Sequence, residues 1–378
     1  MKLQFLTVCF LGLFISPYIH AVTPNTVVAT INGGVNPGGI AITPDNHTAY
    51  VANVNSYEII NEHTVSVINL KTNAIEKIIR DPSFNEVYTV TLNAKATKAY
   101  VTNSNSSTVS IIDTHTNQVS GIIYGFDGPS GMVIDPDRNI GYVNNYGGPE
   151  GVGSGNGRTI SIVNLNTNII IGTIEVDQGP VALAIAPNRE FLYVINYVDG
   201  NPGTGTMNII QTDINQVVGT IRGFFGPFGI AVTPNGKYAY ITNFGSNNFD
   251  PIGTTVSVVN LKKRLITTTI DLALQPAGIG ITPDGRFAYV SNYNTLYRHK
   301  DFTELNPGDG TVSIIDISRN EVLPLTILVG ASPARVTISP NGKFAYVSNF
   351  TANTIDVIAL PRKSHRNKFS IASECSYN

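Results

Sequence analysis

The sequence contains almost none of the residues that cross-link chains or hold redox cofactors. It has two cysteines and no tryptophan in 378 residues. Cys9 lies in an apolar N-terminal segment that is expected to be removed, which leaves Cys375 alone near the other end. A disulfide framework is therefore excluded. Covalent haem is excluded as well, because no C-x-x-C-H motif occurs.

Charged residues are also scarce, at 13 % of the chain against a usual ~25 %. Apolar residues make up 42 %, so solubility must come from Asn, Thr, Ser and Gly, as in turn-rich β proteins outside the cytoplasm. The formal net charge is −2. Residues 361–378 carry four basic residues against one acidic residue, and Lys2 lies in the leader, so the chain between them is near −6. That sign argues against a nucleic-acid partner.

Long apolar runs are missing apart from residues 3–15, and these 13 residues are too few to span a bilayer comfortably. Lys2 precedes the run, Pro17 ends it and Ala21 offers a small residue for cleavage. We predict a secretory signal peptide over 1–21, export to the periplasm or the cell exterior, and no transmembrane segment after cleavage. An uncleaved anchor is the alternative. The basic segment 361–378 is predicted to be a disordered tail.

The sequence does contain an internal repeat. The tetrapeptide Tyr-Val-Thr-Asn, with variations, occurs seven times at spacings of 42 to 57 residues. Each copy follows a stretch such as PAGIGITPDG (276–285) and precedes one such as TVSVVN (255–260). The tyrosines of the seven copies are Tyr50, Tyr100, Tyr142, Tyr193, Tyr240, Tyr289 and Tyr346.

The repeated stretches are short, rich in Val, Ile, Thr and Tyr, and bounded by turn residues, which is the signature of β-strands. Asp-Gly at 284–285 and Asn-Gly at 235–236 predict tight hairpins between the first two strands of a copy. Four strands in each of seven copies predict an all-β fold, a seven-bladed β-propeller with four-stranded antiparallel blades over residues 22–360.

The two ends of the repeat region are incomplete in complementary ways. The seventh copy stops at Leu360, after its third strand. Residues 26–31 match the fourth strand of the other copies, such as VVGTI at 217–221. We therefore predict that the N-terminal strand completes the last blade and closes the ring, which removes exposed sheet edges.

The YVTN tetrapeptides, the TPDG and SPNG turns before them and the TVSVID-like strands after them resemble the YVTN family of β-propellers. That family includes archaeal surface-layer proteins and bacterial periplasmic propellers. The resemblance covers nearly all of residues 22–360. It implies a seven-bladed propeller outside the cytoplasm, and it leaves the activity open because propellers host many unrelated functions.

Function is expected where the sevenfold symmetry breaks, since a residue that recurs in every blade serves the blade. The seven repeated asparagines are accordingly assigned to bonding turn backbone. The loops that follow them share one face of the predicted propeller, called here the loop-rich face. They have four residues in blades 2 and 7 and are longest in blade 6, where the loop opens at Tyr293. We predict that a ligand or partner binds this face around blades 3 to 6.

The blade 6 loop holds the densest mixed cluster of side chains, and we interpret it either as a contact for an anionic or sugar-like ligand or as a solvated loop tip. The cluster consists of Tyr297, Arg298, His299, Lys300 and Asp301.

Aromatic residues gather at a second position. In blades 3 to 7 one follows the repeated Asn, and the connections between blades add Phe126, Phe224, Phe225 and Phe228. These rings either cover the tops of the blades or form a rim for a sugar, a peptide or a partner protein. The five that follow the Asn are Tyr146, Tyr197, Phe244, Tyr293 and Phe350.

Arg335 breaks the symmetry of the first strand. It lies two residues after the position where most blades start with proline, and the six other blades have a small or neutral residue there. If this ring of positions lines the mouth of the channel, Arg335 either binds an anion or pairs with a nearby acid.

Catalytic motifs are absent: there is no G-x-S-x-G and no H-E-x-x-H. Of the five histidines beyond residue 21, only His63 and His299 fall in the long loops, which argues against a three-histidine metal site. No catalytic residue, metal ligand or resident cofactor is assigned. NPGDG (306–310) and DPDRN (135–139) hold oxygen ligands that suit Ca²⁺, but neither has EF-hand spacing.

The leading hypothesis is an exported binding scaffold for an unidentified protein, glycan or small anionic ligand. One alternative is a lactonase- or lyase-like propeller enzyme with its site at the channel mouth. The other is a structural protein of a surface layer.

Overall fold

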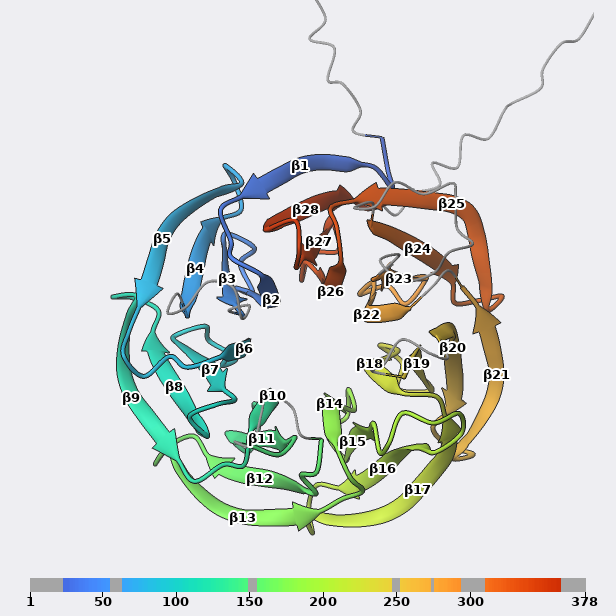
Figure 1. Ribbon diagram of the computed structural model, residues 1–378, viewed down its shortest axis with the longest axis horizontal. Helices are drawn as coiled ribbons and strands as arrows, with labels where there is room; N and C mark the ends of the chain where they lie inside the picture. The colour runs from blue at the N-terminus through green and yellow to red at the C-terminus, as the bar shows by residue number, and fades with distance from the viewer. Residues whose placement is uncertain are drawn as a thin grey trace, which may run out of the picture.

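The strands form a closed ring of seven four-stranded antiparallel sheets, as Figure 1 shows. The structure is a computed structural model that describes residues 23–54, 63–148, 155–246, 252–272, 275–293 and 310–361. The described residues form strands, turns and irregular segments and no helix. The predicted seven-bladed β-propeller is therefore confirmed. The predicted signal peptide and nearly all of the predicted tail lie outside the described residues.

Every blade uses its strands in the same order from the channel outward. The inner strands are β2 (Pro37–Ile42), β6 (Val87–Leu92), β10 (Pro129–Asp135), β14 (Pro180–Ile185), β18 (Pro227–Val232), β22 (Pro276–Ile281) and β26 (Pro333–Ile338). The second strands are β3 (Thr48–Asn53), β7 (Lys98–Asn103), β11 (Ile140–Asn145), β15 (Phe191–Asn196), β19 (Tyr238–Gly245), β23 (Phe287–Asn292) and β27 (Phe344–Asn349). The third strands are β4 (Thr64–Asn69), β8 (Thr108–Asp113), β12 (Thr159–Asn164), β16 (Gly205–Gln211), β20 (Ile252–Asn260), β24 (Gly310–Asp316) and β28 (Thr354–Ala359). The outer strands are β5 (Ala74–Arg80), β9 (Gln118–Tyr124), β13 (Ile169–Glu175), β17 (Gln216–Phe224), β21 (Leu265–Asp271), β25 (Glu321–Val329) and β1 (Val27–Asn32).

The N-terminal strand closes the ring, as predicted. β1 pairs antiparallel with β28, and Ile31 lies opposite Ile355. Ile31 is buried in a core cluster that also contains Ile355 and Tyr346. Seven blades thus consist of six continuous segments and one sheet built from both ends of the described chain (Figure 1).

The repeated tyrosine joins neighbouring blades. Its ring is buried, and in four blades its hydroxyl donates a hydrogen bond to an asparagine in the turn before the outer strand of the next blade. These asparagines have left-handed backbone, which Asn adopts more readily than most residues. The pairs are Tyr50–Asn117 (2.6 Å), Tyr142–Asn215 (3.1 Å), Tyr240–Asn320 (2.5 Å) and Tyr289–Asn25 (2.6 Å). The last of them ties blade 6 to the closing strand.

The repeated asparagine has a structural role, but its main partners differ from the expected turn backbone. Asn103 donates through Nδ2 to Thr108 (3.1 Å) and Ser110 (2.8 Å) on the third strand of its own blade. Asn292 makes the same pair of bonds to Thr311 and Ser313. Only the carbonyl side of the amide meets connection backbone, as where Asp127 donates to Asn145 at 3.3 Å. The Thr-x-Ser pattern of the third strand therefore supplies the partners of the repeated Asn in five blades, and Asn208 and Asp356 take the place of the serine in blades 4 and 7.

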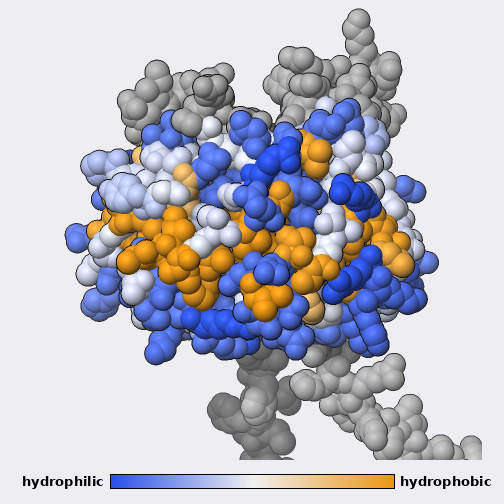
Figure 2. Space-filling model, turned by 90° about the horizontal axis from the view of Figure 1, so that it is seen from below, coloured by the Kyte–Doolittle hydropathy of each residue, from blue (hydrophilic) through white to orange (hydrophobic). Residues whose placement is uncertain are grey.

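Ring closure covers the edge of β28 but leaves every blade with an uncovered outer strand, so the expectation that closure removes exposed edges was too broad. Ile169 and Ile171 of β13 are 59 % and 57 % exposed, and Leu328 of β25 is 64 % exposed. Figure 2 shows apolar side chains gathered in a band along the side of the propeller. An uncovered strand with apolar side chains is a surface that another chain can join.

Candidate binding site at the channel mouth

The same backbone hydrogen bond in every blade holds the residue after the repeated Asn over the start of an inner strand. The residue before each inner strand has left-handed backbone, whether it is Gly226 or the non-glycine Gln275. Its carbonyl accepts a hydrogen bond from the residue after the Asn, as from Phe244 (3.0 Å) and Tyr293 (2.9 Å). The aromatic residues of blades 3 to 7 are therefore held at the loop-rich end of the channel.

The inner strands enclose a cavity of about 230 Å³. We call the position of Arg335 and its equivalents in the six other blades, two residues after the start of each inner strand, the ring position. All seven of its residues line the cavity: Gly39, Thr89, Gly131, Ala182, Gly229, Gly278 and Arg335. A β-bulge at the start of each inner strand sets this position, and in three blades a hydroxyl on the second strand accepts its N–H. Of the described residues that line the cavity, Arg335 alone carries a charge.

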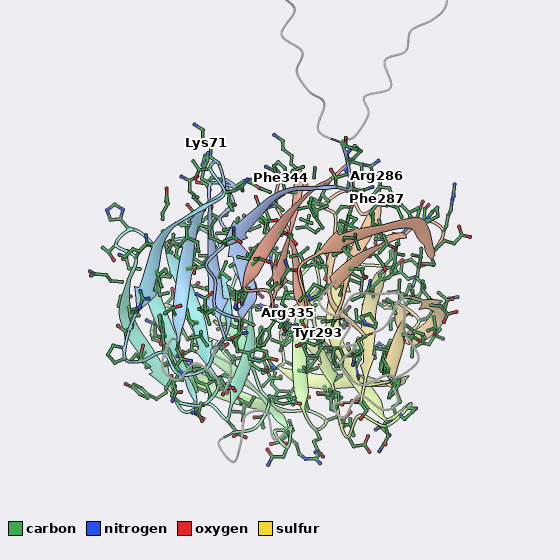
Figure 3. All side chains as sticks on the ribbon, turned by 45° about the horizontal axis from the view of Figure 1, so that its top comes forward. Lys71, Arg286, Phe287, Tyr293, Arg335 and Phe344 are labelled. Atoms are coloured by element: carbon green, nitrogen blue, oxygen red, sulfur yellow. The ribbon has the colours of Figure 1, made fainter. Side chains whose placement is uncertain are left out.

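The Arg335 side chain reaches across the channel mouth, and no acidic residue of the described ranges forms an ion pair with it. Its Cζ lies 4.7 Å from the centre of the Phe228 ring and 5.9 Å from that of the Tyr88 ring. Arg335 belongs to blade 7, Phe228 to blade 5 and Tyr88 to blade 2, so three non-adjacent blades meet here. Such contacts between a cation and an aromatic face are attractive. Figure 3 labels Arg335 in the interior of the ring.

Three aromatic side chains form a chain of contacts that begins at the Phe228 ring beside Arg335. Phe228 packs against Phe244 with 5.3 Å between ring centres, and Phe244 meets Tyr293 edge-on at 5.8 Å. Burial raises the pKa of Tyr293, and its hydrogen bond with Ser332 partly opposes this. We call Tyr88, Phe228, Phe244, Tyr293 and Arg335 the mouth cluster. Four of its members were singled out from sequence.

Tyr88 was missed, although the sequence contains a signal for it. It occupies the position directly after the start of the inner strand, as Phe228 does, and the five other blades have Gly, Ser, Val or Ala there. Two aromatic residues at a repeat position that otherwise carries smaller side chains break the sevenfold symmetry, as Arg335 does at its own position.

Two predicted site residues lie elsewhere. Tyr197 is 6 % exposed, and its hydroxyl donates to the Gly245 carbonyl of the next blade at 3.1 Å. Tyr146 packs against the same core cluster as Tyr197. Both rings fill the space between blades. Tyr297, Arg298, His299 and Asp301 lie outside the described residues.

A separate polar pair lies between blades 1 and 2. The Glu86 backbone N–H donates to His63 Nδ1 at 2.9 Å, and the Glu86 side chain is 6 % exposed. Burial raises the pKa of Glu86 to about 7 and lowers the pKa of His63. Of the residues that a lactonase- or lyase-like site would need at the channel mouth, Arg335 contacts Phe228 and Tyr88, His63 contacts Glu86, and His299 lies outside the described residues.

Glu86 makes the stability of the protein depend on pH. Its folded pKa of about 7 lies above the ordinary 4.5, so the folded state holds the proton more tightly, and stability is lost as pH rises from about 4.5 through 7. We expect Glu86→Gln to be more stable than the wild type above pH 7 by about 1 to 3 kcal/mol. The gain should shrink toward pH 4.5. Urea unfolding across this range measures it.

The matched control for this prediction is Glu175→Gln, which neutralises an exposed carboxylate at the end of β13. It should give a small stability change over the same range. A Glu86→Gln difference that stays constant from pH 4.5 to 8 would show that the effect does not come from ionisation.

The described residues offer little for a metal ion. They contain no group of three or more His, Cys, Asp or Glu residues that could hold one. In the DPDRN turn, Asp135 accepts two backbone N–H groups, and Asp137 pairs with Arg189 at 2.8 Å. Both carboxylates of the proposed calcium motif are thus engaged within the protein. The NPGDG motif falls outside the described residues except for Gly310.

Within the described part of the chain, no helix is long and apolar enough to cross a membrane.

Comparison with known proteins supports the fold and no activity. No protein-family model matches the chain, and no curated protein sequence does. Membership of the YVTN family therefore stays a prediction. Among solved structures, hydrazine synthase of Kuenenia stuttgartiensis is similar, with a TM-score of 0.70 and 20 % identity over 92 % of this chain and 99 % of that chain.

A chain of a mitotic checkpoint complex is equally similar, with a TM-score of 0.70 and 13 % identity over 96 % of this chain and 100 % of that one. These two proteins have unrelated names and roles, and 1639 solved chains match in all, so the likeness establishes the propeller and does not select among its functions.

Proposed function

We propose that this protein is an exported β-propeller of the YVTN type that acts as an interaction scaffold and binds a protein or glycan partner through its loop-rich face. The observation that carries the proposal is the mouth cluster. Its four rings and one cation come from blades 2, 5, 6 and 7 and meet at one end of the channel. Rings that only covered the tops of single blades would not converge in this way.

The chemistry of the cluster suits a partner surface. Tyrosine, phenylalanine and arginine are the residues that interfaces favour over Lys and Glu, because they give contact area together with directed polar contacts. The loop that begins after Tyr293 is the longest on this face. It starts at the residue that follows a member of the mouth cluster in the sequence. A similar fold in a multi-protein assembly, the mitotic checkpoint complex, is consistent with a scaffold.

The proposal is tested by shortening residues 294–309 to the four-residue length of the blade 2 loop. Folding is expected to be unaffected, because the cut lies between β23 and β24 and outside both strands. Capture of partners in a pull-down, and of glycans in a thermal-shift screen, is expected to be lost. The unfolding midpoint, measured by circular dichroism, shows that the variant is intact.

The matched control changes the opposite face, where Lys237 and Arg286 lie in the short turns of blades 5 and 6 (Figure 3 labels Arg286). Replacing both by alanine should leave capture unchanged. If the shortened variant still captures the same partners as the wild type, the loop or the face is wrongly assigned. Ordered self-assembly of the purified protein, seen by light scattering, would favour the surface-layer alternative.

A further inference from the structure

We propose that the mouth of the central channel binds a carboxylate group, that Arg335 is the cation that anchors it, and that the cavity between the inner strands, lined by aliphatic and hydroxyl residues, receives the body of the ligand. This inference goes beyond partner binding by the loops, because it concerns the channel itself and names the chemistry of what enters it.

The charge of Arg335 is not neutralised within the described protein. No described residue forms an ion pair with it or accepts a hydrogen bond from it. Glu86 does not compensate it, since burial is the cause that raises the pKa of Glu86. Arg335 is only half-buried, and its guanidinium offers five N–H donors. A partly desolvated cation with unused donors favours an anionic acceptor.

The contacts of Arg335 hold it in place without using those donors. The Phe228 and Tyr88 rings meet Cζ at 4.7 Å and 5.9 Å, and such ring contacts consume no N–H group. The N–H groups of a guanidinium lie in a planar fork that matches the two oxygens of a carboxylate. Arg335 is therefore pre-positioned for a two-point contact at the channel mouth.

The single positive charge of Arg335 favours a ligand group with a single negative charge. Arg335 is the single charged residue among the described residues that line the cavity, so a phosphate dianion would remain half neutralised there. The negative charge of the chain as a whole also opposes polyanions. A carboxylate, with one charge and two coplanar oxygens, fits this setting better than a tetrahedral anion.

The wall of the cavity suits a small organic body. The inner strands line the cavity with aliphatic residues such as Leu183 and Ile230 and with hydroxyl residues such as Thr89, Ser130 and Thr337. The space of about 230 Å³ exists because six of the seven ring positions carry small or neutral residues. Pockets that combine apolar contacts with a few directed polar groups are characteristic of small-molecule sites, and the hydroxyl groups here can bond polar substituents of the ligand.

The test measures binding of benzoate and acetate to the full chain by calorimetry, beside their neutral amides benzamide and acetamide and beside inorganic phosphate. The carboxylates should bind and the amides should bind at least about tenfold more weakly, because they lack the charge that strengthens the hydrogen bonds. Amides that bind as tightly as the acids, or phosphate that binds more tightly than acetate, would overturn the proposal.

Two substitutions separate charge from geometry. Arg335→Gln should weaken benzoate binding by about ten- to one hundredfold, and Arg335→Lys should fall between it and the wild type, because Lys keeps the charge and loses the planar fork. The matched control is Arg158→Gln, which removes one exposed arginine from the same face outside the channel. It should bind benzoate as the wild type does. Wild-type affinity in a folded Arg335→Gln variant would refute the assignment.

The carboxylate belongs either to a free acid or to the end of a longer chain, and a peptide pair distinguishes the two sources. N-acetyl-triglycine that binds more tightly than acetate, with loss of binding on C-terminal amidation, identifies a chain terminus. Tighter binding of the free acids identifies a small metabolite, and both results support the site. Shortening 294–309 tests the loops alone: if capture survives this change while Arg335→Gln still loses benzoate, only the partner proposal fails.

Discussion

A variant that lacks residues 23–32 is expected not to fold into a stable ring. The deletion removes β1 and with it the outer strand of blade 7, so β28 loses its ladder partner and Ile31 leaves the core. Loss of a buried Ile costs about 2 to 5 kcal/mol, and each ladder hydrogen bond adds about 1 kcal/mol. Together these losses approach the whole stability of a typical domain, about 5 to 15 kcal/mol. Solubility and urea unfolding followed by circular dichroism measure the effect.

The matched control removes a longer segment from the other end. Deleting residues 362–378 takes away no strand of the ring and is expected to leave the unfolding midpoint near that of the full chain. Ile31→Ala keeps the strand and should cost about 2 to 5 kcal/mol, which gives a measurable value if the deletion is insoluble. A cooperative transition at the wild-type midpoint after loss of residues 23–32 would show that β1 does not close the ring.

The second large effect is expected from adding one methyl group, in Gly278→Ala. A Cβ at this position would lie 2.6 Å from the Arg335 Cα and 2.8 Å from the Ala334 carbonyl oxygen. Both atoms are backbone of β26, so relief requires blades 6 and 7 to move apart. We expect a loss of about 3 kcal/mol, the upper part of the range for overpacked cores. Because the clash displaces the Arg335 backbone, benzoate binding should weaken as well.

Gly172→Ala is the matched control for this prediction. Its added Cβ would lie 3.5 Å from the Ile162 Cδ1 atom, which is ordinary contact, and the residue sits in the exposed outer strand β13. Its effect should range from none to a gain of about 1 kcal/mol from the less flexible unfolded chain. If the two substitutions had equal effects in thermal unfolding, the close approach of β22 to β26 would be in doubt.

The parts of the fold that follow a local rule were predictable from sequence. The Asp-Gly and Asn-Gly turns have their glycines at φ of +70° and +67°, as the hairpins require. The repeated tyrosine and asparagine were correctly assigned to the blade, but their partners were not identified. Tyr240 bonds Asn320, 80 residues away, and such a pairing depends on how blades sit side by side. The sequence shows that these residues recur and does not show which atoms they meet.

The candidate site was predictable only where one position departs from its own repeat. Arg335 and Phe228 stood out in this way, whereas Tyr88 was overlooked beside the more obvious aromatic row. The aromatic residues that follow the repeated Asn do not all lie at the mouth. Phe244 and Tyr293 join the mouth cluster, whereas Tyr197 lies between blades and bonds Gly245. Chemically similar residues at one repeat position thus take different roles, because the connection that each one meets has a different length and sequence.

The sequence by itself determined the seven blades, their strand order and the closure by β1, because these depend on periodic patterns and on two incomplete ends that complement each other. The tertiary structure alone decided what stands at the channel mouth. Tyr88, Phe228 and Arg335 are separated by more than a hundred residues at each step, and they meet because a ring of seven sheets points all its inner strands at one axis. Side chains from non-adjacent blades can touch only there, so the contact belongs to the closed ring and to no local stretch of the chain.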